Sequence, residues 1–151
     1  MGSRTSSDES YILELCDHVL GIQASRQATF DFLRGDPGTR GRGVKLRVDA
    51  YYPSLQLVIE YRERQHSEDV AFFDKRDRLT ISGIHRGEQR KRYDERRRQI
   101  LPAHDITLLE LPFDDFEHDS QKRLRRHRVH DEQVIRTKLA RWLQCALPLP
   151  E

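Results

Sequence analysis

The sequence has no long apolar stretch and few cysteines, and these absences exclude several classes of protein. No window of its 151 residues approaches the roughly 20 apolar residues that cross a bilayer, and residues 1–8 lack the apolar run of a signal peptide. The two cysteines, Cys16 and Cys145, both lie in apolar helical patterns. We therefore expect an intracellular, cytoplasmic protein with reduced core thiols and no membrane partner, rather than a disulfide scaffold.

Several catalytic motifs are also missing, and the charge is nearly balanced. The phosphate-binding Gly-x-x-x-x-Gly-Lys-Ser/Thr motif, the dinucleotide motif Gly-x-Gly-x-x-Gly and the zinc-protease motif His-Glu-x-x-His do not occur. Lys and Arg number 27 against 25 Asp and Glu, which gives a formal net charge of +2. Because this sum excludes a simple polycation, any nucleic-acid role depends on how the charges are arranged.

Apolar periodicity predicts one domain over residues 10–151, preceded by a loose leader over 1–9. Helices are expected over 10–20, 25–33, 88–101 and 131–146, and strands over 44–51, 55–62 and 106–111, the last of them buried on both faces. Residues 63–86 are undecided, with a short strand or an extended loop at 79–84, and 114–128 is a loop or an exposed helix. This order predicts an α+β, three-layer α/β/α fold, with a β-hairpin at the core of a mixed sheet flanked by helices.

The most informative polar residues are Asp49, Glu60 and Arg62. Asp49 lies on the polar face of the first hairpin strand, and Glu60 and Arg62 share one face of the second, so a turn at Pro53 brings the three together. Two carboxylates and a cation can hold Mg²⁺ (or Mn²⁺), activate water and stabilise negative charge on a phosphate. The alternative is a set of cross-strand ion pairs, each contributing about 0.2–1 kcal/mol.

With its flanking segments, this pattern resembles the PD-(D/E)XK nuclease superfamily, the restriction-endonuclease-like fold. Val48-Asp49 precedes Glu60-Tyr61-Arg62 by eleven residues, and residues 92–101 and 104–110 look like the helix and strand that end the core of small very-short-patch-repair-like members. The resemblance covers residues 10–111 and implies a Mg²⁺-dependent DNA endonuclease with Asp49 and Glu60 as metal ligands.

The resemblance extends to three further residues. Arg62 stands where the family usually has lysine; it can stabilise charge or orient water but cannot act as a base, because arginine stays protonated. Many members carry a glutamate on the first helix, and Glu14 is favoured over Glu9 for that role; Glu14 can equally be a solvated residue. His66 follows the second strand and is a candidate proton donor or base, or an ordinary surface histidine.

Arginine-rich segments could hold a nucleic-acid backbone. Residues 86–98 carry seven basic residues against three acids, and 122–128 carries no acid at all. The predicted DNA contacts are Arg92, Arg96, Arg97, Arg123 and Arg126; the alternative for the first segment is a solvated helix laced with ion pairs. A third basic segment is the Gly-rich loop 40–43, which either folds onto nucleic acid or is flexible.

The main functional prediction is therefore phosphodiester hydrolysis by metal-activated water, with DNA as partner and RNA left open. A catalytically degenerate nucleic-acid-binding domain on the same fold is the second interpretation, and a protein-interaction module the third. The helix around Trp142 either supplies a homodimer interface or covers the sheet.

Overall fold

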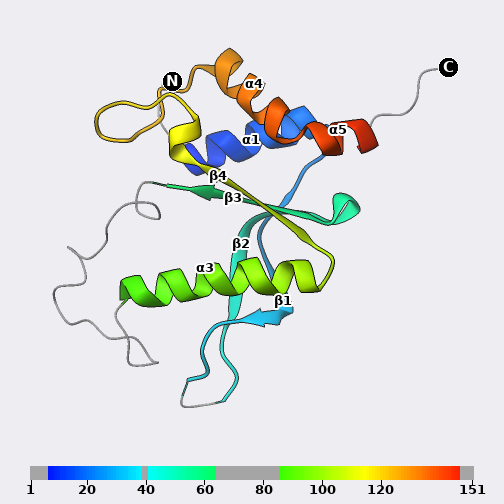
Figure 1. Cartoon of the computed structure of the whole chain (residues 1–151), viewed down its shortest axis with the longest axis vertical. Coiled ribbons are helices and arrows are strands. Elements are labelled where there is room, and N and C mark those ends of the chain that lie inside the picture. Colours follow the sequence, from blue (N-terminus) through cyan, green and yellow to red (C-terminus); the bar gives the residue numbers. More distant parts are fainter. Residues whose placement is uncertain (1–6, 39–40, 64–85, 147–151) are drawn as a thin grey trace.

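The structure is a computed structural model of the chain and describes residues 7–38, 41–63 and 86–146. Figure 1 shows the order of its elements along the chain. The helices are α1 (Asp8–Leu20), α3 (Arg86–Ala103), α4 (Arg128–Lys138) and α5 (Ala140–Ala146), the strands are β1 (Ser25–Arg34), β2 (Lys45–Tyr52), β3 (Leu57–Arg62) and β4 (Thr107–Pro112), and the 3-10 turns are η1 (Pro53–Leu55) and η3 (Phe113–Asp115). The segment 79–84, predicted as a strand or a loop, lies outside the described residues.

The described strands form one mixed sheet in the order β1-β2-β3-β4. β1 and β3 both run antiparallel to β2, and β4 runs parallel to β3, from the pair Leu57 and Thr107 to the pair Arg62 and Pro112. η1, which begins at Pro53, connects β2 to β3, so the predicted hairpin is confirmed. Parallel neighbours need a long crossover connection, and α3 is part of the one between β3 and β4.

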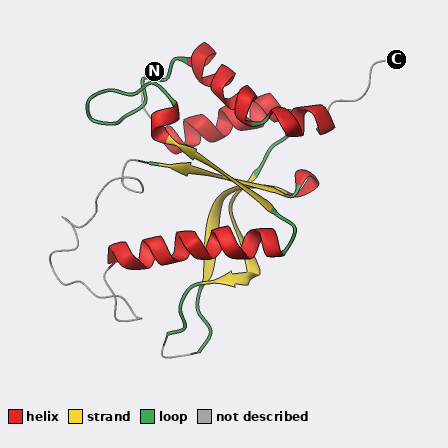
Figure 2. Cartoon of the chain, viewed as in Figure 1, coloured by secondary structure: helices red, strands yellow, loops and turns green. Residues whose placement is uncertain are grey.

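Helices flank both faces of the sheet (Figures 1 and 2). α1, α4 and α5 lie on one face, where a core cluster contains Leu57, Ile59 and Tyr61 of β3 and Trp142 of α5. α3 lies on the other face, where Val58 joins a second cluster. Because side chains alternate along a strand, Glu60 and Arg62 face α3. The predicted α+β class with helices around a mixed sheet is confirmed, and Trp142 packs into the core of its own chain.

The predicted helix over 25–33 is wrong, because this segment forms β1. The extended conformation is favoured by Thr29, Phe30 and Phe32, and it is stabilised by pairing with β2, a partner about 20 residues away in sequence that a local pattern does not reveal. Phe30 stacks on Phe32 with ring centroids 5.1 Å apart and meets the ring of Tyr51 of β2 edge-on at 4.9 Å.

Burial on the two central strands also differs from the prediction. All six residues of β3 are buried, including the polar ones, whereas β4 is mostly half-buried. β4 lies at the edge of the described sheet and lacks a neighbour there on its outer side, so it is less covered than its apolar sequence suggests. β2 begins at Lys45, and Val44 is exposed although the alternation placed it among the inward-facing residues.

The helix ends follow capping rules more closely than periodicity. α1 begins at Asp8, inside the predicted leader, because the Ser7 side chain accepts a hydrogen bond from the Ser10 N–H at 3.0 Å. Gly21 ends the helix as predicted, in the left-handed conformation with φ of 74°. The single helix expected over 131–146 is two helices, which meet at Leu139. Among the described residues, no helix is long and apolar enough to span a membrane.

Candidate functional site

Asp49 and Glu60 are joined where β2 and β3 separate. The paired residues of the two strands end at Ala50 and Ile59, one position before the two acids. The Asp49 N–H donates to Glu60 Oε2 at 3.1 Å, and the Tyr61 N–H donates to Asp49 Oδ2 at 2.9 Å. The two carboxylates therefore accept hydrogen bonds from the partner strand's backbone, and the predicted proximity of Asp49 and Glu60 is present in the structure.

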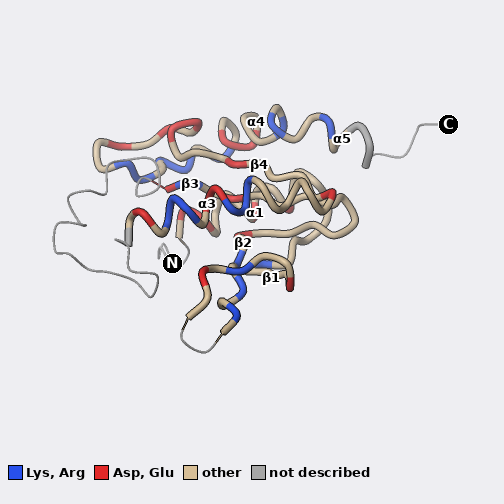
Figure 3. The backbone as a smooth tube through the Cα atoms, turned by 60° about the horizontal axis from the view of Figure 1, so that its bottom comes forward, with Lys and Arg blue, Asp and Glu red and all other residues tan. Residues whose placement is uncertain are grey.

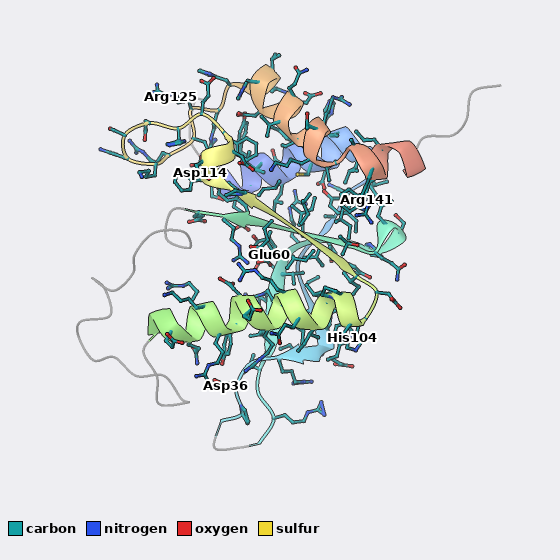
Figure 4. The ribbon with its side chains drawn as sticks, in the orientation of Figure 1. Asp36, Glu60, His104, Asp114, Arg125 and Arg141 are labelled. Carbon is teal, nitrogen blue, oxygen red and sulfur yellow. The ribbon has the colours of Figure 1, made fainter. Side chains whose placement is uncertain are left out.

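Burial gives Glu60 an unusual protonation equilibrium. The residue is only 4% exposed, between β3 and α3 (Figure 4). Burial and then the neighbouring Asp49 charge raise the pKa of Glu60 to about 7, although Arg97 and Arg62 act in the opposite direction. The two guanidinium groups stay 3.8 and 3.7 Å from the Glu60 carboxylate. At neutral pH, the buried Glu60 carboxylate beside the half-buried Asp49 carboxylate thus favours a proton or an additional cation.

Arg62 is buried beside Glu60, but its short contacts are with other acids. Its Nη1 lies 3.0 Å from Asp94 of α3, and its Nε donates to Glu110 of β4 at 2.8 Å. Glu110 reaches this position because it is paired with Glu60 in the parallel β3–β4 register. Arg98 also donates to Glu110, at 2.7 and 3.0 Å, so hydrogen bonds from Arg98 and Arg62 hold the pKa of Glu110 below its usual range.

Asp94 and Glu110, which both contact Arg62, are parts of the site that the sequence analysis did not predict. Glu110 carries a recognisable signal, since it is the one acid in the apolar run 106–111. Asp94 carries no such signal, because its helix is charged on all sides and only the tertiary structure shows which of its acids points at the sheet.

The arginines predicted to contact DNA on α3 differ in what they touch. Arg96 donates to the Arg34 carbonyl oxygen and to Asp36, both at 2.9 Å, while Arg97 donates to the Arg47 carbonyl oxygen and to Asp94, both at 3.1 Å. These hydrogen bonds fasten α3 to β1 and β2, so both guanidinium groups are occupied within the chain. Arg92 is exposed on α3.

The second basic segment lies on the side of the sheet away from Glu60, in the loop before α4, where Figure 4 labels Arg125. Arg126 donates twice to Asp8 of α1, at 3.1 and 2.9 Å, and its guanidinium lies over the ring of Tyr11. Arg123 is exposed beside Asp119, at 3.5 Å. The loop is thus fastened to α1 and is not joined to the acid pair.

The remaining predicted residues do not extend the site. Glu14 is exposed on α1, the helix on the opposite face of the sheet from α3. His66 lies outside the described residues. The structure therefore brings together Asp49, Glu60 and Arg62 of the predicted set with Arg97, which was predicted as a DNA contact, and it adds Asp94 and Glu110.

The donor set can be tested against the predicted metal. Within the described ranges, no three His, Cys, Asp or Glu side chains are arranged to hold a metal ion by themselves. Mg²⁺ commonly binds through one or two carboxylates, with waters and substrate phosphates completing its coordination. Asp49 and Glu60 are hard oxygen donors with unfavourable mutual repulsion, which a divalent cation would relieve, so this pair fits Mg²⁺ or Mn²⁺.

Comparisons with known proteins add a sequence relative without an assigned activity. No protein-family model matches the chain, and no solved structure matches it significantly. The chain is 32% identical over 85 residues to the uncharacterized protein 307L of Invertebrate iridescent virus 6. The match covers 55% of this chain and 39% of the relative, so this similarity does not define a family for the chain.

Proposed function

We propose that the protein is a metal-dependent DNA endonuclease of the restriction-endonuclease-like type, with its active site at the Asp49–Glu60 pair. The observation that carries this proposal is the hydrogen-bonded juxtaposition of the half-buried Asp49 carboxylate and the buried Glu60 carboxylate, in which Glu60 has a raised pKa. A strongly perturbed acid beside a second acid is typical of catalytic and metal-binding sites. The order of α1, the β2–β3 hairpin, α3 and β4 also supports the proposal, because the resemblance implies a helix before the hairpin and a helix and strand after it.

In this proposal, Asp49 and Glu60 hold a Mg²⁺ or Mn²⁺ ion. When bound, the ion supplies a water nucleophile at neutral pH and neutralises charge on the phosphate. Arg62 keeps its proton at every working pH and does not act as a base. Its charge, together with that of Arg97, offsets Glu60 and the acids Asp94 and Glu110 around the site.

One observation favours a second candidate, a nucleic-acid-binding domain that has lost catalysis. The guanidinium of Arg62 is held at 3.0 Å by Asp94 and at 2.8 Å by Glu110, so it is engaged with acids of its own chain. Lysine, which the family usually has here, is a compact charge with three donors, and the change to arginine is not conservative in a tight site.

A plasmid-nicking assay tests the proposed activity. Wild-type protein is expected to convert supercoiled plasmid to the open-circular form with Mg²⁺ or Mn²⁺, and to lose the activity in EDTA. The variants Asp49→Asn and Glu60→Gln keep the size of each side chain and should remove the activity. Glu132→Gln, on α4 at the opposite side of the sheet, is the matched control and should nick as wild type does. Nicking that needs no metal, or that persists in both site variants, would contradict the proposal.

The variant Arg62→Lys separates the two candidates. If the protein is an active nuclease, the wild type nicks and the variant changes the rate. If catalysis has been lost, the wild type binds DNA without nicking it, and the lysine variant gains metal-dependent nicking. A protein with no salt-sensitive DNA binding in either form would leave the protein-interaction interpretation.

A further inference from the structure

The β1–β2 ribbon extends past α3 and carries its own cationic surface. In Figure 3, blue segments lie along this ribbon as well as on α3. The ribbon places Arg34, Arg42, Lys45 and Arg47 near its free end, and Arg42, Lys45 and Arg47 are exposed. Within the described residues, the guanidinium groups of Arg42 and Arg47 have no ion-pair partner, unlike those of Arg96, Arg97 and Arg126.

One exposed carboxylate lies at the centre of these cations. Asp31 is 82% exposed, yet its Oδ1 is 2.8 Å from Lys45 Nζ and 3.8 Å from Arg34 Nη2. The hydrogen bond from Lys45 and then its charge hold the pKa of Asp31 below its usual range, and Arg34 and Arg42 act in the same direction. Lys45 and Arg34 thus contact a single surface anion, and Arg42 lines the same open hollow as Asp31 and Arg34, an arrangement that would equally suit a phosphate.

Arg47 connects this cluster to the acid pair. Lys45, Arg47 and Asp49 are alternate residues of β2, so they share one face at a spacing of about 6.7 Å. The Arg47 carbonyl oxygen accepts a hydrogen bond from Arg97 Nε, which lies 3.8 Å from Glu60 Oε2. The strand face therefore runs from a cationic end to the carboxylates, at a spacing that suits successive phosphates of one polynucleotide strand.

We propose that the exposed β1–β2 ribbon binds a nucleic-acid backbone, with one phosphate taking the position of the Asp31 carboxylate among Arg34, Arg42 and Lys45, and with Arg47 contacting the next phosphate toward Asp49. The direction toward the acid pair rests on the proposed nuclease function. Binding itself does not, since the cations belong to the ribbon and not to the carboxylate pair. Asp31 is then an internal competitor that occupies the phosphate position when no nucleic acid is bound.

The test is fluorescence anisotropy with a short labelled DNA duplex in EDTA, so that no cleavage takes place. Each phosphate contact contributes a slope of about −0.9 in a plot of log affinity against log salt, which is about a 3.5-fold loss of affinity between 50 and 200 mM salt. Arg47→Gln removes one of the two proposed phosphate contacts and should reduce the salt-dependent loss by about 3.5-fold. The triple variant Arg42→Gln, Lys45→Gln, Arg47→Gln weakens both contacts and should reduce that loss by up to about 12-fold. Arg141→Gln, an exposed arginine on α5, is the matched control and should bind as wild type does.

A second variant tests the competitor directly. Asp31→Asn removes the negative charge without removing a cation, so it should tighten binding, and the gain should be about 3.5-fold larger at 50 mM than at 200 mM salt if one additional phosphate is contacted. The inference would be overturned if the triple variant binds as wild type does, or if Asp31→Asn leaves the affinity unchanged or lowers it. Failure of the nuclease proposal looks different, because the duplex would then bind to the ribbon in EDTA but stay intact with Mg²⁺.

Discussion

In the variant Glu60→Gln, the free energy of unfolding should fall less at alkaline pH than it does in the wild type. Glu60 is buried against Asp49, and its nearest arginine nitrogens lie at 3.7 and 3.8 Å. Ionisation of Glu60 in the folded state is therefore unfavourable. Glutamine keeps the shape and still accepts the hydrogen bond from the Asp49 N–H, but it never carries the charge.

The magnitude follows from linkage between protonation and folding. The pKa of Glu60 is raised from 4.5 to about 7, and each pKa unit corresponds to 1.36 kcal/mol, which gives about 3 kcal/mol. Because the folded state binds the proton more tightly, this stability is fully present below pH 4.5 and is lost as the pH rises through 7. Glu60→Gln should therefore match the wild type near pH 4.5 and exceed its free energy of unfolding by up to about 3 kcal/mol at pH 8.

Urea unfolding at several pH values measures this difference. The quantity to compare is the unfolding free energy of the variant minus that of the wild type at each pH, because the other titrating groups contribute equally to both proteins and cancel. Adding Mg²⁺ at pH 8 should stabilise the wild type and leave the variant unchanged, because the ion replaces the missing counter-charge. A difference in unfolding free energy that is constant between pH 4.5 and pH 8, or that has the opposite sign, would refute the reasoning about Glu60.

Three further predictions concern the stability effects of changes at single positions. Arg62→Leu should lower the free energy of unfolding by about 3 kcal/mol, because Asp94 and Glu110 each lose a guanidinium partner, although Arg97 still contacts Asp94 and Arg98 still contacts Glu110. Arg62→Lys should cost less, and urea unfolding measures both. Arg96→Gln should lower the free energy of unfolding by about 1–3 kcal/mol, because the hydrogen bonds to the Arg34 carbonyl oxygen and to Asp36 are lost. DNA affinity in the anisotropy assay should change little. A large loss of affinity with unchanged stability would show instead that Arg96 contacts DNA. Gly21→Ala should lower the free energy of unfolding by about 1 kcal/mol, because φ of 74° is strained for alanine. Val44→Ala, at an exposed position, should change the free energy of unfolding by no more than about 0.5 kcal/mol.

The fold could be predicted where local patterns agree with tertiary packing. The β2–β3 hairpin, α1, α3 and β4 follow from alternation, periodicity and the turn at Pro53, all of which act over short stretches of chain. β1 could not be predicted in the same way, because its residues are stabilised as a strand by β2, which follows after a loop. Burial of β4 was overestimated for a related reason, since strand order decides which strand lies at the edge.

The candidate site was predictable to the extent that one hairpin defines it. Residue spacing and the turn sufficed to place Asp49 beside Glu60 and Arg62. The contacts of Arg62 with Asp94 and Glu110 depend on how α3 and β4 pack against β3, which no local pattern contains. Charge counting identified arginine-rich segments correctly, but only the structure shows that Arg96, Arg97 and Arg126 are bound to acids and carbonyl groups of the same chain while Arg47 is exposed.

The central claim, that Asp49 and Glu60 form a divalent-cation site, is tested most directly by titrating the protein with Mn²⁺ and measuring free Mn²⁺ by electron paramagnetic resonance. We expect the wild type to take up Mn²⁺ at pH 8, Mg²⁺ to displace it, and both Asp49→Asn and Glu60→Gln to abolish the uptake. Glu132→Gln should bind Mn²⁺ as the wild type does. Equal uptake by the wild type and both site variants, or no uptake by the wild type, would contradict the claim.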